Sequence, residues 1–284
     1  MTKTDDTDET LVLGGTGKIG RRVVERLLAR GVPTRVGSRS GRPPFDWENT
    51  STWAPALEGV RSAYVSYSPD LAFPGATETV GAFAELAIQS GVSRLVLLAG
   101  RGEPEAEEGE EAVRESGADL TVLRSTFFAQ NFSEDFWRDA ILGGELALPA
   151  GDVPEPFVDA GDIADVAVAA LTDDRHIGEL YELTGPRLLT FAEAVLEISR
   201  AVGREIRYAP ISIEAFAAAA AGQGVPSEVV EMLTFIFGEV LDGRNARLGD
   251  GVQRALGREP RDFSDYARDA AATGIWNPTA TRAA

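Results

Sequence analysis

The sequence has no cysteine, one histidine and two lysines in 284 residues, and these absences exclude several kinds of chemistry. Without cysteine there is no disulfide, no thiolate nucleophile and no cysteine-based metal site. The single histidine, His176, lies in the polar connector "TDDRHIGE", where we expect it on the surface. Histidine catalysis and histidine metal clusters are therefore poor candidates, and we expect no metal ion.

Basic residues and long apolar runs are also scarce. Asp and Glu number 45 against 27 Lys and Arg, and the net charge of -18 repels a phosphate backbone, so we expect no nucleic-acid partner. The first residues are polar and acidic, and no apolar run approaches the roughly 20 residues that span a bilayer. We expect a cytoplasmic protein without a membrane partner, and 44% hydrophobic residues suffice for a full core.

Strand-like apolar runs alternate with helical patterns in the first half, which is typical of βαβ units. The sequence therefore predicts an α/β fold with a doubly wound, Rossmann-type parallel sheet. The predicted strands lie within residues 10–15, 33–40, 62–69, 93–100 and 118–128, and the predicted helices within 20–31, 52–60, 76–91, 103–117 and 159–173.

Helical patterns dominate after residue 186, with one strand-like stretch, "EIRYAPISI". This change predicts a smaller, mostly helical cap over the carboxyl edge of the sheet, where open α/β folds bind ligands. The expected organisation is a disordered tail at 1–9, a Rossmann domain at 10–185, a substrate-binding cap at 186–276 and a second tail at 277–284.

The stretch "LVLGGTGKIG" places Gly14, Gly17 and Gly20 between a predicted strand and a predicted helix. Glycines at this spacing permit a tight turn, the approach of the backbone to a pyrophosphate, and close packing of helix on strand. The amino terminus of the helix then faces the phosphates with unpaired N–H groups. This context predicts a dinucleotide-binding site.

The end of the second predicted strand, "RVGSRS", indicates which dinucleotide binds. An acid there would accept a hydrogen bond from the ribose 2′-hydroxyl, whereas an arginine accommodates a 2′-phosphate. Here Ser38, Arg39 and Ser40 supply donors and no acid is present, so we expect NADP(H), with Lys18 as a second cation. The alternative is that "GSRS" is only an exposed basic turn.

These motifs, together with "SGVSRLVLLAG", "GADLTVLRSTFFAQNF" and "FVDAGDIADVAVAAL", resemble the NmrA-like branch of the atypical short-chain dehydrogenase/reductases, and more narrowly the festuclavine-dehydrogenase-like reductases. The resemblance implies that NADPH lies along the sheet edge. The residues that it implies for the cofactor are Gly14, Thr16, Gly17 and Ile19 at the pyrophosphate, Ser38 and Arg39 at the 2′-phosphate, Asp46 and Trp47 at the adenine, and Ser66 and Tyr67 at the nicotinamide ribose.

The chain departs from ordinary short-chain reductases, which pair a tyrosine with a lysine four residues later. No tyrosine here has that partner, and "LAGRGE" stands where a serine is expected. The nicotinamide half must then be held by backbone and neighbouring side chains. For this we expect Ser66, Ala99, Gly100, Ser125, Thr126, Phe127 and Phe128.

Three interpretations stay open. The first is an NADPH-dependent reductase acting on an acceptor that needs little acid catalysis, such as a quinone or an iminium ion, with Tyr67, Phe128 and Asn131 as candidate catalytic residues. The second is an NADP(H)-sensing regulator, and the third is a cofactor-bound scaffold with non-redox chemistry. We expect a small apolar or aromatic substrate and a monomer or homodimer.

Two clusters have alternative interpretations. The glutamates of "EPEAEEGEE" either attract a cationic substrate or form a solvated helix face. The aromatic residues that follow the "LTVLR" strand either line a flat pocket, with Asn131 as a polar handle, or belong to the core. They are Phe127, Phe128, Phe132, Phe136 and Trp137.

Overall fold

The computed structural model describes residues 8–135 and 137–277, which form two compact units. Among these residues, unit 1 comprises 8–125, 160–183 and 250–258, and unit 2 comprises 126–159, 184–249 and 259–277. The expected division at residue 185 differs from this arrangement, because the chain passes between the units repeatedly. Residues 126–159 pack with the later helices, and residues 250–258 return to unit 1.

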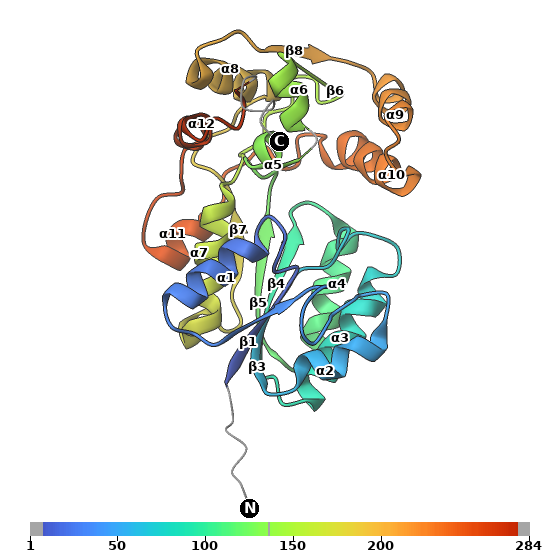
Figure 1. The fold of residues 1–284 in the computed structure, drawn as a ribbon, viewed down its shortest axis with the longest axis vertical. Coiled ribbons are helices and arrows are strands. Elements are labelled where there is room, and N and C mark those ends of the chain that lie inside the picture. The colour runs from blue at the N-terminus through green and yellow to red at the C-terminus, as the bar shows by residue number, and fades with distance from the viewer. Residues whose placement is uncertain (1–7, 136, 278–284) are drawn as a thin grey trace, which may run out of the picture. The chain divides into compact units, whose positions relative to one another are not determined.

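Unit 1 is built on a six-stranded parallel sheet with the strand order β2-β1-β3-β4-β5-β7 (Figure 1). Every neighbouring pair in this sheet is parallel, which confirms the predicted Rossmann-type α/β fold. The strands are β1 (Glu9–Leu13), β2 (Thr34–Gly37), β3 (Val60–Val65), β4 (Arg94–Gly100), β5 (Asp119–Ser125) and β7 (Leu180–Leu183).

Helices cover both faces of this sheet. In Figure 1, α1, α7 and α11 lie on one face, and α2, α3 and α4 lie on the other. Their bounds are α1 (Gly20–Ala29), α2 (Trp53–Leu57), α3 (Ala76–Gln89), α4 (Pro104–Glu115), α7 (Ala160–Thr172) and α11 (Gly251–Leu256), with two short 3₁₀ turns, η1 (Thr50–Thr52) and η2 (Asp174–His176).

The core of unit 1 follows from the alternation of side chains along the strands. Leu11, Leu13 and Leu97 point to the face that Phe83 of α3 covers, and all four are fully buried. On the opposite face, residues of α7 are almost all buried, and its two aspartates, Asp162 and Asp165, form ion pairs. These strands are buried on both faces, as parallel sheets require.

Ion pairs of Arg258, two residues after the end of α11, attach this segment to α7. Arg258 lies 2.7 Å from carboxylate oxygens of both Asp162 and Asp165 of α7, and Asp165 is also 2.5 Å from Arg26 of α1. Gly251 lies directly on β7, since a Cβ there would be 2.5 Å from the Glu182 carbonyl oxygen. The late segment is therefore an integral part of the first unit.

Unit 2 contains a two-stranded parallel ribbon and short helices. The ribbon pairs β6 (Glu145–Leu148) with β8 (Arg207–Pro210), of which only β8 lies in a predicted strand. The helices are α5 (Asn131–Glu134), α6 (Trp137–Gly143), α8 (Phe191–Val202), α9 (Ile213–Gly222), α10 (Ser227–Phe235) and α12 (Phe263–Ala272), and the segment η3 (Ile236–Val240) is a π-helix.

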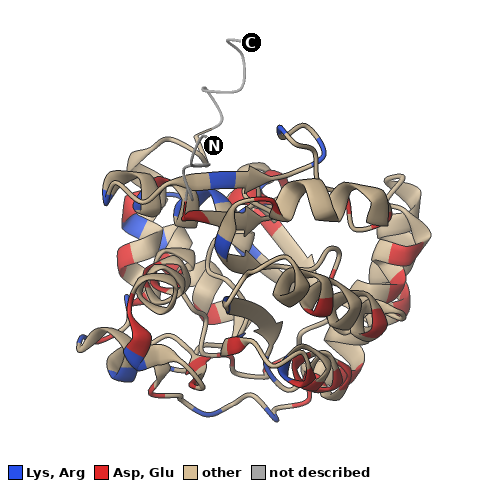
Figure 2. Cartoon of the chain, turned by 90° about the horizontal axis from the view of Figure 1, so that it is seen from below, with Lys and Arg blue, Asp and Glu red and all other residues tan. Residues whose placement is uncertain are grey.

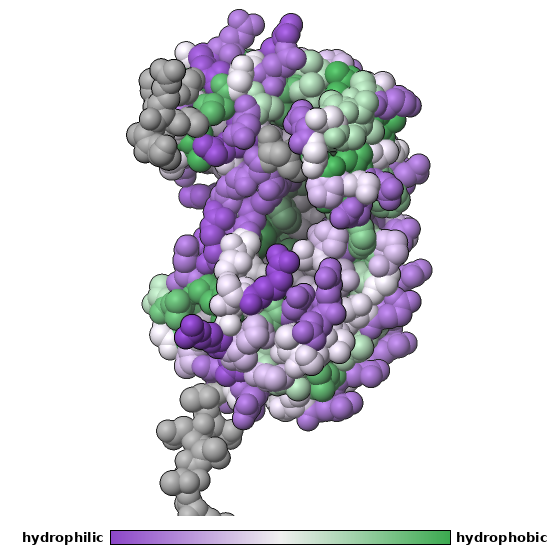
Figure 3. Space-filling view, turned by 45° about the vertical axis from the view of Figure 1, so that its right-hand side comes forward, coloured by the Kyte–Doolittle hydropathy of each residue, from purple (hydrophilic) through white to green (hydrophobic). Residues whose placement is uncertain are grey.

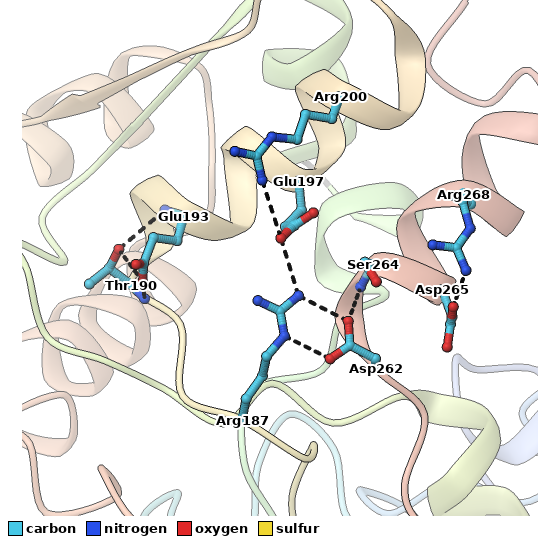
Figure 4. Close-up of polar contacts among 9 residues, drawn as sticks. All are labelled: Arg187, Thr190, Glu193, Glu197, Arg200, Asp262, Ser264, Asp265 and Arg268. Carbon is cyan, nitrogen blue, oxygen red and sulfur yellow. Dashed lines mark hydrogen bonds and ion pairs between the residues drawn. The ribbon is translucent and has the colours of Figure 1, made fainter.

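An arginine-centred network links α8 and α12 (Figure 4). The guanidinium of Arg187 donates to both oxygens of Asp262, at 2.7 and 2.9 Å, and to Glu197 at 3.2 Å. Asp262 also caps α12 by accepting from the Ser264 N–H at 2.8 Å. These hydrogen bonds hold the pKa of Asp262 well below its usual range.

Two expectations about the chain's polar segments are corrected. Glu9 is not part of a tail: it begins β1 and forms an ion pair with Arg35. His176 is not on the surface but 1% exposed, because its Nδ1 lies 2.7 Å from the Tyr181 hydroxyl and its carbonyl accepts from Thr121 at 2.7 Å. The rest of the expected tails, residues 1–7 and 278–284, lies outside the described residues.

The charged surface is mixed. In Figure 2, basic residues lie among acidic ones, and the face seen in Figure 3 carries mostly hydrophilic side chains with smaller apolar areas. Across the part of the chain that the structure describes, no helix combines the length and apolar character that crossing a membrane requires.

Candidate cofactor site at the carboxyl edge of the sheet

The glycine-rich loop runs from the end of β1 into α1. Gly14 has a φ of +63°, and its carbonyl oxygen accepts from the Gly17 N–H at 2.8 Å, which closes a tight turn. A Cβ at Gly20 would lie only 2.1 Å from that carbonyl oxygen. Only glycine allows the loop to fold back so closely on the helix.

The loop leaves the start of α1 able to bind an anion. No side-chain hydrogen bond caps the helix and no acid lies in its first turn, where the Arg21 N–H donates to the Gly17 carbonyl at 3.1 Å. Gly14, Thr16 and Gly17 are exposed, Lys18 is half-buried, and Ile19 anchors the loop in the core at 5% exposure. These properties fit a pyrophosphate.

The turn after β2 presents an arginine. The Ser38 carbonyl accepts from the N–H groups of both Gly41 and Phe45 at 2.9 Å, which folds residues 38–45 tightly. Arg39 is exposed at the tip of this turn, and among the described residues it has no hydrogen bond or ion pair. The carboxylate of Asp46 accepts from the Glu48 N–H at 3.1 Å, within its own turn.

Ser66 and Trp47 lie next to the loop. A Cβ at Gly14 would be 3.6 Å from the Cβ of Ser66, which places the end of β3 beside the first glycine. The indole N–H of Trp47 donates to the Ser66 carbonyl at 3.2 Å. The ring of Tyr67 packs on Trp47 with centroids 5.1 Å apart, so the structure gives Tyr67 a packing contact, and its role as proton donor stays a prediction.

The ends of β4 and β5 lie side by side. Gly100 pairs with Ser125, and the Arg101 N–H donates to the Ser125 carbonyl at 3.0 Å. The Ser125 hydroxyl donates to the Ala99 carbonyl at 3.4 Å. The structure therefore brings these three expected residues together at one edge of the sheet.

The remaining expected residues belong to unit 2. Thr126 donates to the Pro156 carbonyl at 2.8 Å, and Phe127 packs on Phe191 at 5.4 Å between ring centroids. Phe128 and Asn131 are half-buried at the start of α5, where the Asn131 N–H donates to the Phe128 carbonyl at 3.0 Å. Their proposed role near the nicotinamide stays a prediction.

Part of the expected aromatic pocket is core. Phe132 is fully buried and Trp137 is 4% exposed, both packed among the aromatic rings of unit 2. Phe136 lies outside the described residues. Phe132 lies on the buried side of α5 and Trp137 on the buried side of α6, so both rings are in the core.

The acidic helix α4 is neither a uniformly solvated face nor an open cation site. Glu110 is 2% exposed and binds Arg124 of β5 through two hydrogen bonds of 2.7 Å, and Glu107 adds a third at 3.2 Å. Glu111 pairs with Arg114 on the same helix. These carboxylates are engaged by the protein's own arginines.

Sequence reasoning missed two acids at this edge. Glu103, directly before α4, is 8% exposed, and its side chain faces Asp70 in the loop after β3. Burial, with the charge of Asp70 and a hydrogen bond to it, raises the pKa of Glu103 to about 8. The local signal was an acid three residues after a strand end, in "LAGRGE".

Comparison with known proteins identifies the class. A model of the NmrA-like family matches residues 108–267, more than half of the chain. The chain belongs to this family, as its motifs predicted.

Relatives and solved structures are similar over nearly the full length. The chain is 32% identical to the uncharacterized oxidoreductase YesF of Bacillus subtilis (strain 168), covering 94% of this chain and 97% of that protein. It is 32% identical to agroclavine dehydrogenase of Claviceps fusiformis, covering 91% and 96%. The structure of the NADPH-dependent quinone oxidoreductase QOR2 of Escherichia coli, complexed with NADPH, shares the fold with a TM-score of 0.77 at 20% identity, covering 92% and 99%.

Proposed function

We propose that this protein is an NADPH-dependent oxidoreductase that transfers a hydride to a small organic acceptor such as a quinone, an iminium ion or a conjugated carbonyl. Membership of the NmrA-like family and the names of the relatives support a reductase. The observation that carries the proposal is the glycine loop: the close approach of Gly20 to Gly14 leaves an exposed backbone cradle at an uncapped helix start.

The residues present fit this cofactor. Gly14, Thr16 and Gly17 would line the pyrophosphate as a backbone cradle, whose turn is closed by the Gly17 N–H donating to the Gly14 carbonyl, and Arg39 would bind the 2′-phosphate. The fit rests on the exposed guanidinium of Arg39, to which no described residue forms a hydrogen bond or ion pair, and on the lack of an acid at the end of β2. A hydrogen bond from the Trp47 indole to the Ser66 carbonyl links these two residues next to the loop.

Bound NADPH would supply the hydride. The chain's own residues would orient the acceptor and exclude water, which are the main contributions of the protein in such reactions. Because the chain lacks a tyrosine–lysine pair, the nicotinamide half would depend on Ala99, Gly100, Ser125 and the "STFF" segment. We propose Tyr67 of unit 1 as a contact of an apolar or aromatic acceptor.

Calorimetric titration of the chain with NADPH and NADH tests the cofactor assignment. We expect NADPH to bind at least tenfold more tightly, about 1.4 kcal/mol, and Arg39→Ala to remove most of this preference by weakening NADPH alone. Arg30→Ala, an exposed arginine at the other end of α1, is the matched control and should change neither affinity. Equal affinities of the unmodified chain for the two cofactors would refute the assignment.

A panel of quinones, iminium ions and conjugated carbonyls, followed at the nicotinamide absorbance, tests turnover. Reduction of at least one class is expected. Tight NADPH binding with no reduction of any acceptor would instead favour a redox-sensing protein, an alternative that the missing tyrosine–lysine pair keeps open.

A further inference from the structure

The carboxyl group of Glu103 occupies an unusual position. Glu103 is the residue before α4, yet its side chain does not cap that helix. Instead the carboxyl lies against the end of β4: a Cβ at Gly100 would be 2.1 Å from Oε2 and 2.4 Å from Oε1. The carboxyl thus fills the space that a side chain at position 100 would take, at the sheet edge that carries the glycine loop.

Asp70 reaches the same point from the neighbouring strand. β3 and β4 are adjacent, so the loops that follow them meet at the carboxyl edge. The Asp70 loop is fixed in place, since its Oδ1 accepts from the Ala72 N–H at 2.9 Å and Leu71 packs on Gly109 of α4, where a Cβ would be 2.9 Å from the leucine. The two carboxyl groups therefore face one another on rigid supports.

The surroundings favour one proton on this pair. The groups that face Glu103 are the carboxylates of Asp70 and Glu105, and both raise the pKa of Glu103. Arg101 lies 3.0 Å from Glu182, and Arg124 binds Glu110. A protonated Glu103 can donate to Asp70, as two neighbouring carboxyls do when they share one proton.

One carboxyl oxygen of the pair accepts no hydrogen bond from the described residues. Oε2 of Glu103 is buried and, among the described residues, has no hydrogen-bond partner. Orphaned buried oxygens are rare because burial without a partner costs about 1–3 kcal/mol. Because the group lies at the sheet edge that also carries the glycine loop, it is a candidate for a chemical role.

We propose that Asp70 and Glu103 share one proton and supply it to the acceptor as it is reduced, in place of the absent tyrosine and lysine. This inference rests on the proposed function. With a quinone, the hydride carries two electrons from the nicotinamide to the acceptor and leaves a hydroquinone anion. The O–H bond of the carboxylic acid then breaks, a new O–H bond forms on that anion, and the electron pair stays on the carboxylate, which water reprotonates.

The acceptor class provides an internal control. A quinone or a conjugated carbonyl needs one proton after the hydride, whereas an iminium ion becomes a neutral amine with the hydride alone. Loss of the shared proton should therefore slow the first two classes and leave the third unchanged. A substitution that merely disturbed the fold would slow all of them.

Infrared titration of the cofactor-free chain tests the proton itself. We expect a protonated-carboxyl band that disappears with a midpoint near pH 8, is missing in Glu103→Gln, and titrates at lower pH in Asp70→Asn, where a negative neighbour is gone. Glu108→Gln, an exposed glutamate of α4, is the matched control and should keep the band. A band that Glu103→Gln leaves in place overturns the proposal.

Turnover of the NADPH-loaded variants tests delivery. Glu103→Gln should lower quinone reduction at pH 7 by roughly a hundredfold, a common loss for a general acid, with NADPH affinity unchanged and iminium reduction unchanged. Equal slowing of quinone and iminium overturns the proposal while the reductase stands. If the unmodified chain reduces no acceptor, the proposed function fails, and delivery fails with it.

Discussion

Replacing Gly20 by alanine should separate the fold of the glycine loop from its capacity to bind a dinucleotide. The new Cβ would lie 2.1 Å from the Gly14 carbonyl oxygen, 2.6 Å from its carbon and 2.8 Å from the Cα of Gly15. Carbon atoms in proteins do not approach such atoms within 3.0 Å, so the loop must move away from α1 by about 1 Å.

The size of the effect follows from the loop's hydrogen bonds. Displacement by about 1 Å breaks at least one charge-assisted bond from a loop N–H to the pyrophosphate, which costs about 1.5–3 kcal/mol. The Kd for NADPH should therefore rise by roughly 10- to 150-fold. Overpacking should also lower the free energy of unfolding by about 1–3 kcal/mol.

Gly17→Ala gives a graded comparison. Its Cβ would be 3.2 Å from the same carbonyl oxygen, which a shift of a few tenths of an ångström relieves, so we expect a smaller loss of stability than for Gly20→Ala. Gly222→Ala, with open space around its Cβ, is the control. Calorimetric titration gives the affinities, and urea unfolding followed by circular dichroism gives the stabilities. A folded Gly20→Ala chain that binds NADPH within threefold of the unmodified chain would falsify the steric reasoning.

Two further substitutions each test an ion pair within one unit, Glu110 with Arg124 in unit 1 and Asp262 with Arg187 in unit 2. Glu110→Gln should lower the free energy of unfolding in urea by about 3 kcal/mol, because it removes the buried carboxylate that accepts both 2.7 Å hydrogen bonds of Arg124 and leaves only the more exposed Glu107. Glu111→Gln on the surface should cost under about 0.5 kcal/mol, and similar losses for the two variants would contradict a buried pair. Asp262→Asn should cost about 1 kcal/mol at pH 7, since Arg187 is partly exposed and solvent screens the pair. Because the pKa of Asp262 is lowered in the fold, the ionised carboxylate stabilises the chain above the ordinary aspartate pKa of about 4, and this stabilisation is lost as the pH falls through the lowered pKa. The difference in unfolding free energy between the unmodified chain and Asp262→Asn should therefore shrink in acid. A difference that grows below pH 4 contradicts the assignment.

The local parts of the site could be predicted from the sequence. The glycine loop needs only an apolar strand, glycines at fixed spacing and an amphipathic helix, all within residues 9–29. The turn after β2 is equally local, because "RVGSRS" shows directly that no acid follows the strand. Such features are encoded by neighbours along the chain.

The parts that depend on distant pairing could not be predicted. Asp70 and Glu103 meet only because β3 lies beside β4, and neither residue carries a local sign of its partner. The same holds for His176, which is buried by Thr121 and Tyr181, and for residues 250–258, which lie on β7 although the chain around them belongs to unit 2. In each case the residues meet because the order of the strands in the sheet brings distant segments of the chain together.

The interleaving of the two units has a consequence for synthesis on the ribosome. When residue 125 has emerged, β5 is complete but its outer edge has no neighbour, since β7 is made only at residues 180–183. An open strand edge of this kind can pair with other chains. The nascent protein must therefore carry an unprotected edge while it makes the first segment of unit 2, and a fragment that ends before β7 should be prone to aggregate. Neither unit can be cut out as one continuous piece of the gene.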